Sequence, residues 1–279
     1  MLDMKSVVDH RERIAPPIAG ARMAPHYAFF GVSALIFAAS MAVTIIWCGS
    51  MSSMDMPMLG GWRMSMAWMR MPDQTWPGAA AMFLGMWIVM MVAMMLPSLV
   101  PMLWRYRLAV VTIGGTRLEL LTAVAGMGYF FVWTVFGMVA YPLGVALAEL
   151  EMRQEAVSRA VPFVMGVVVL LAGALQFTSW KAGHLACCRE SPGCGSLAAD
   201  AGTAWRHGLS LGLHCARCCA GQMAVLLVIG VMDLRAMAVV TAAITIERLA
   251  PAGGRIARAI GFIAIGGGLH LLARAAGSG

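Results

Sequence analysis

Long apolar runs separated by short polar segments dominate the chain. Several runs approach or exceed the roughly 18 apolar residues that cross a bilayer as a helix. A transmembrane β-barrel would instead show short segments of alternating polarity. The pattern therefore predicts an all-α fold, a polytopic transmembrane helix bundle of about seven spans. The expected spans are 27–47, 78–104, 120–147, 160–180, 205–232, 234–245 and 256–273.

The sixth run, 234–245, is the shortest and ends at Glu247 and Arg248. If it crosses the bilayer, the bundle has seven spans. If it enters and leaves on the same side, the bundle has six, and the C-terminus lies in the cytoplasm.

Composition supports the membrane interpretation. Hydrophobic residues make up 61% of the chain, charged residues 12%, and the mean hydropathy is +0.80. A soluble domain carries about 25% charged residues, so this chain cannot cover a soluble surface of its size. The net charge of +7 does not indicate nucleic-acid binding, because the charges fall mostly between spans. The expected partner is the lipid bilayer.

The placement of Lys and Arg predicts the orientation through the positive-inside rule. With the N-terminus inside, cytoplasmic segments carry 13 of these residues and external segments carry six. This favours a bacterial inner membrane protein with a cytoplasmic N-terminus. The chain is therefore predicted to have three parts. These are a cytoplasmic tail at 1–26, a first span with a Met-rich external loop at 27–77, and a transmembrane bundle of metal-binding type at 78–275.

The densest chemistry is at 214–219 in the fifth span, where three thiols, an imidazole and a guanidinium occupy six residues. Helical spacing places Cys215 beside Cys218 and Cys219. Thiolate and imidazole are ligands for Cu(I) or Zn(II). Such groups are costly at membrane depth and mark a functional site by default. We expect Arg217 to stabilise a thiolate here.

The polar connection at 181–204 supplies further candidate ligands. His184 and Cys188 are four residues apart and share one helical face. His207 precedes His214 by two helical turns and lies on the same face. The residues expected to complete the site are His184, Cys188, Cys194, His207 and His214.

Methionine is the other unusual feature, with 26 residues in 279. Four thioethers fall within eight residues of the external loop, at Met51, Met54, Met56 and Met58. Thioethers bind Cu(I) well and remain competent where free thiols form disulfides. In the second span, methionines recur at i+4 with two more alongside, which fits either a thioether track or ordinary packing. These are Met82, Met86, Met90, Met94, Met91 and Met95.

Three strings resemble a bacterial family of predicted metal-binding integral membrane proteins over about 78–250: MVAMMLPSLVPML, QFTSWKAGHLACCRESP and the segment from GLSLGLHCARCCAGQM to TIERLAP. The family pattern is K-x-x-C-L-x-x-C-R followed by G-x-x-x-G-x-x-C-x-x-C-C. The matching residues are Lys181, Cys188, Arg189, Cys215, Cys218 and Cys219. His184 stands where a Cys is usual, and Arg217 where a small residue is usual. The resemblance implies a metal site with mixed nitrogen and sulfur ligands.

The sequence thus favours a membrane protein that handles Cu(I) by binding, transfer or transport, with Met groups outside and Cys and His groups within. A periplasmic metal chaperone or a cuproenzyme would be its partner. Two alternatives stay open: a thiol–disulfide oxidoreductase using Cys215 and Cys218, and an assembly subunit stabilised by Zn(II). No nucleotide loop, Ser/His/Asp set or paired carboxylate stands out, which argues against a hydrolase or an ATP-driven pump and favours a non-enzymatic protein.

Overall fold

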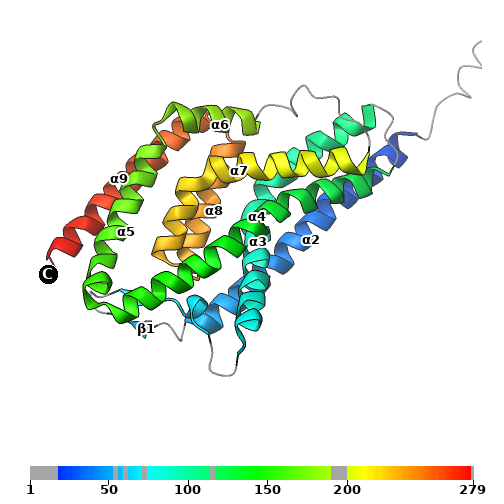
Figure 1. Cartoon of the computed structure of the whole chain (residues 1–279). Helices are drawn as coiled ribbons and strands as arrows, with labels where there is room; N and C mark the ends of the chain where they lie inside the picture. The colour runs from blue at the N-terminus through cyan, green and yellow to red at the C-terminus, as the bar shows by residue number, and fades with distance from the viewer. Residues whose placement is uncertain are drawn as a thin grey trace, which may run out of the picture.

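The computed structural model is a bundle of long helices (Figure 1). It describes residues 18–52, 56–58, 62–70, 74–112, 117–189 and 200–277, without the side chains of 18–26, 52, 57, 112 and 186–189. In chain order the elements are α2 (Ile18–Ser52), β1 (Met56–Pro57), β2 (Arg63–Met64), η1 (Met66–Trp68), α3 (Trp76–Thr112), α4 (Leu118–Arg153), α5 (Glu155–Leu175), α6 (Ser179–Arg189), α7 (Ala201–Ile229), α8 (Leu234–Leu249) and α9 (Gly253–Gly277). The two strands form one short antiparallel ladder.

Six of the described helices are long and apolar enough to cross a membrane: α2, α3, α4, α5, α7 and α9. This confirms the predicted all-α fold with several spans. The uncertain sixth run forms α8, which has 16 residues and spans about 24 Å at 1.5 Å per residue. It packs against α3, α6, α7 and α9. In Figure 1, α8 returns the chain from the end of α7 toward α6, inside the bundle.

The polar stretches predicted between spans are more helical than expected. The segment 149–159 is helical on both sides of Gln154, whose extended backbone separates α4 from α5. The connection before α7 contains the helix α6, which lies across one end of the bundle (Figure 1). A polar composition does not predict such a helix, because its anchoring depends on two buried side chains, those of Lys181 and Leu185, whose partners lie elsewhere in the chain.

Helices α4 and α7 run side by side and touch through glycines (Figure 1). A methyl group added at Gly208 would overlap the backbone of Ala125. One added at Gly212 would lie 2.9 Å from the carbonyl oxygen of Tyr129, and one at Gly128 would lie 2.7 Å from that of Trp205. Small residues spaced four apart allow helix backbones to approach closely. This contact places Tyr129 directly against α7.

Gly208→Ala should lower the free energy of unfolding by about 1–3 kcal/mol, because overpacking forces the two backbones apart. The matched control is Gly85→Ala in α3, where an added methyl group meets nothing within 4 Å. Unfolding in detergent, monitored by circular dichroism, measures the free energy of unfolding of both variants. Equal stability of the two variants would contradict the close contact.

Helix α7 has a defined cap at each end. Asp200 Oδ2 accepts a hydrogen bond from the Thr203 hydroxyl at 2.7 Å, and Oδ1 accepts one from the Thr203 backbone N–H at 3.0 Å. These bonds, the hydroxyl bond foremost, hold the pKa of Asp200 below its usual range. At the other end, Gly230 adopts φ 139°, which favours glycine. Cys215 therefore lies at the midpoint of a helix of 29 residues.

Candidate functional site

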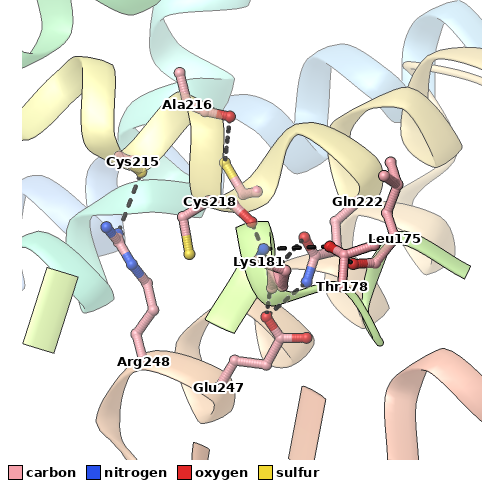
Figure 2. Close-up of polar contacts among 10 residues, drawn as sticks. Leu175, Thr178, Lys181, Cys215, Ala216, Cys218, Gln222, Glu247 and Arg248 are labelled. Atoms are coloured by element: carbon pink, nitrogen blue, oxygen red, sulfur yellow. Dashed lines mark hydrogen bonds and ion pairs between the residues drawn. The ribbon is translucent and has the colours of Figure 1, made fainter. Parts of the chain in front are cut away.

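The thiol of Cys215 is fully buried, and groups from three other helices contact it. The Tyr129 hydroxyl of α4 donates a hydrogen bond to Sγ at 2.9 Å. Arg248 Nη1 of α8 lies 3.2 Å from the same sulfur, as Figure 2 shows. Met95 Sδ of α3 lies 4.0 Å away. A sulfur that faces a hydroxyl and a guanidinium is in a setting that stabilises a thiolate.

Arg248 is the buried charge that contacts the thiol of Cys215. Its side chain is 5% exposed, and Nη1 also donates to Ser98 Oγ at 3.0 Å. Arg217, which we expected beside a thiolate, is exposed. Two residues along a helix correspond to a rotation of about 200°, so Arg217 points away from Cys215. The expectation for Arg217 was therefore wrong, and the guanidinium at the thiol comes from α8.

The other two cysteines of α7, Cys218 and Cys219, are also buried but have different neighbours. Cys219 is 2% exposed, and its thiol donates to the carbonyl oxygen of Ala216 at 3.9 Å. Cys218 is 3% exposed and packs in a second cluster with Leu185 of α6 and Met102 of α3. Within the described residues, Cys215, Cys218, Cys219 and Cys48 form no disulfide bond.

A buried ion pair holds α6, α7 and α8 together one turn further along α7. Lys181 Nζ lies 2.7 Å from Glu247 Oε2, and both side chains are at most 4% exposed. Lys181 Nζ also donates to the carbonyl oxygen of Cys218 at 2.7 Å, and Gln222 Nε2 donates to Glu247 at 2.8 Å (Figure 2). Adjacent residues of α8 thus contact α6 through Glu247 and the thiol cluster through Arg248.

The predicted histidine ligands lie in two other places. The rings of His184 and His214 approach with centroids 6.5 Å apart, and His214 Nδ1 lies 2.7 Å from the carbonyl oxygen of Ser210. His207 stacks on Tyr106 with centroids 4.9 Å apart. In the part of the chain that the structure describes, no three His, Cys, Asp or Glu side chains form a preformed metal group.

Some of the remaining predicted ligands lie outside the part of the chain that the structure describes, and the others lie within it. Cys188 belongs to α6, but its side chain lies outside the described residues, as do Cys194 and Met54 entirely. Met51 lies in the last turn of α2 and is half-buried, Met56 is 40% exposed in β1, and Met58 is half-buried.

The methionines of α3 form a buried line toward Cys215. Met90, Met91, Met94 and Met95 are each at most 2% exposed. Burial alone fits both a thioether track and ordinary packing. The contact of Met95 with Cys215 adds a thioether to the thiol cluster.

Sequence reasoning missed two residues that contact Cys215, namely Tyr129 and Arg248. It also missed Ser98, which contacts Arg248. The adjacent charges Glu247 and Arg248 were a usable signal, because charges in an apolar run mark functional sites. We had assigned them to the end of a span. Tyr129 has no comparable signal, because it lies among other aromatic residues of an apolar run.

The fold and the site define a class: an apolar helix bundle with a buried, sulfur-rich centre suited to a soft metal ion. A family model, PpoB2, described as a copper chaperone, matches residues 84–271. The match covers more than half of the chain, so the chain belongs to this copper chaperone family. It includes α7 and α8, whereas the Met-rich segment before α3 lies outside it. No curated protein and no solved structure matches the chain.

Proposed function

We propose that this chain binds Cu(I) at Cys215 and passes it on, as a copper chaperone embedded in a bacterial inner membrane. The observation that carries the proposal is the Cys215 thiol, which has Arg248 Nη1 at 3.2 Å, the Tyr129 hydroxyl at 2.9 Å and Met95 Sδ at 4.0 Å. Thiolate and thioether are the ligands that Cu(I) prefers. Membership of a copper chaperone family supports copper as the cargo.

The proposed ligands are the thiolates of Cys215 and Cys219 and the thioether of Met95. Two thiolates with one Cu(I) ion carry a net charge of −1, which the guanidinium of Arg248 balances. Cys218 is the next thiol along α7 and would receive the ion on transfer. Structural Zn(II) usually takes four nitrogen or sulfur ligands. The described residues bring together no such set of His, Cys, Asp and Glu, which favours Cu(I).

The proposed orientation places the α6 end of the bundle in the cytoplasm and the Met-rich segment in the periplasm. It rests on the excess of Lys and Arg in the segments assigned to the cytoplasm, including the tail at 1–26. A periplasmic metal chaperone or a cuproenzyme would then exchange Cu(I) with the bundle at 78–275. The six apolar helices support placement in the bilayer.

The test is the variant Cys215→Ser/Cys218→Ser/Cys219→Ser, purified in detergent and loaded anaerobically with Cu(I). We expect the wild type to show a thiolate-to-Cu(I) charge-transfer band in the ultraviolet, and the variant to lack this band and to bind one Cu(I) fewer. Metal analysis gives the stoichiometry. The matched control is Cys48→Ser, because Cys48 is also buried but contacts Met232 instead.

Three results would contradict the proposal. One is a charge-transfer band unchanged in the triple variant, and another is stoichiometric zinc in the wild type. The third is a protein that binds no metal but contains a disulfide that can be titrated, which would favour the oxidoreductase alternative.

A further inference from the structure

A cavity of about 220 Å³ lies between the C-terminal end of α2, the segment around η1, the start of α3 and the turn between α7 and α8. In Figure 1 this is the end of the bundle opposite α6. Twelve residues line the cavity, and half of them are methionines: Met51, Met66, Met69, Met82, Met86 and Met232. The whole chain has 26 methionines in 279 residues, so thioethers are concentrated here.

These thioethers come from four separate segments. A stripe of methionines along one helix is ordinary packing, but Met51, Met66, Met86 and Met232 are far apart in the sequence and meet only in the fold. Long, unbranched thioether side chains adapt their rotamers readily. Together they can close around a small ion.

The rest of the lining selects against hard ions. Gln74 is its polar residue, and Gln74 Nε2 donates to Met82 Sδ at 3.6 Å. The described lining includes no carboxylate, which Ca²⁺ or Mg²⁺ would require. The aromatic residues Trp47, Phe83 and Tyr141 complete the wall, and aromatic ring faces attract cations. The fitting ligand is a soft monovalent cation, Cu(I) or its analogue Ag(I).

A line of buried sulfur joins this cavity to the thiol cluster. Met86 lines the cavity, and Met95 on the same helix contacts Cys215. Nine residues of α-helix separate them by about 14 Å. Met90, Met91 and Met94 lie between and are each at most 2% exposed. Thioethers therefore recur along α3 between the cavity and the thiol of Cys215.

We propose that the Met-lined cavity is a second Cu(I) site, which receives the ion through thioethers and passes it along α3 to Cys215. The identity of the metal rests on the proposed function. The site itself rests on the cavity and its lining. No covalent bond of the protein and no oxidation state changes in this transfer, because each step exchanges one sulfur ligand of Cu(I) for another.

The test uses Ag(I) as the probe and the full chain with Cys215→Ser/Cys218→Ser/Cys219→Ser as the starting protein, in detergent. Equilibrium dialysis should give one bound Ag(I). Adding Met66→Leu/Met86→Leu/Met232→Leu should weaken this binding at least tenfold, because Leu keeps the volume but lacks the sulfur. The control is Met127→Leu/Met138→Leu/Met152→Leu, three exposed methionines outside the cavity.

A starting protein without bound Ag(I), or equal binding by the cavity and control variants, would overturn the proposal. If the cavity variant does not fold, NMR of protein labelled at the methionine methyl groups replaces it. Ag(I) must then shift methyl signals that single Met→Leu changes assign to the cavity, and shifts confined to other methionines would overturn the proposal.

The cavity variant with its cysteines intact separates this proposal from the Cys215 site. It should still show the thiolate-to-Cu(I) band when Cu(I) is added directly. Absence of that band in the wild type would refute the Cys215 site and leave the Ag(I) result standing.

Discussion

Lys181→Met should lower the free energy of unfolding by about 3–5 kcal/mol, because it leaves the carboxylate of Glu247 buried without its counter-charge. Glu247 is 1% exposed, and Lys181 Nζ is its cationic partner at 2.7 Å. Lys181 also donates to the carbonyl oxygen of Cys218. The substitution therefore removes the polar contacts that Lys181 makes with both α7 and α8. Denaturation in mixed detergent micelles, followed by circular dichroism, measures the loss.

Two comparisons make this result specific. Lys181→Met/Glu247→Gln removes both charges, so it should be more stable than Lys181→Met alone. Arg159→Met breaks an exposed ion pair with Glu155, at 3.1 Å, and should cost no more than about 1 kcal/mol. A Lys181→Met protein as stable as the Arg159→Met protein would mean that the buried pair does not hold α6.

Arg248→Met should weaken Cu(I) binding about 10–100-fold. Hydrogen bonds to charged groups contribute about 1.5–3 kcal/mol, and each 1.4 kcal/mol corresponds to a factor of ten. The substitution removes both the hydrogen bond to Cys215 Sγ and the charge that balances the bound thiolates. Competition with a chromophoric Cu(I) chelator measures the affinity.

The matched control for this prediction is Arg217→Met. Arg217 is an exposed arginine two residues from Cys215, so its removal should leave the affinity within about threefold. The affinity of Arg248→Lys should fall between those of the two Met variants, because an ammonium keeps the charge but lacks the planar guanidinium whose Nη1 donates to both Cys215 and Ser98. A larger loss for Arg217→Met than for Arg248→Met would refute the role assigned to Arg248.

The helices were the most predictable part of this molecule, because a bilayer imposes a length on apolar runs that the sequence displays directly. Two elements were not predictable in this way. Helix α8 has 16 residues, too few to be identified by length, and its packing depends on residues far away in the chain. Helix α6 is polar in composition, and the burial of Lys181 in it depends on Glu247, which lies 66 positions away in the sequence.

The placement of Cys215, Cys218 and Cys219 on one helix was also predictable, because it follows from an apolar run in the sequence. The residues that contact these thiols were not. Arg217 is close to Cys215 in sequence and points away, whereas Arg248 is 33 positions distant and makes the contact. Tyr129 reaches the thiol because glycines allow α4 and α7 to approach. The cavity likewise required the fold, since its methionines come from four segments.

The burial of the methionine side chains also determines which of them oxidants reach first. Oxidants convert methionine to its sulfoxide, which is polar and no longer a soft ligand, and exposure controls the rate of that damage. Met90, Met91, Met94 and Met95 are at most 2% exposed, whereas Met56 is 40% exposed. Peroxide therefore reaches Met56 before it reaches the buried methionines of α3, including Met95 beside Cys215.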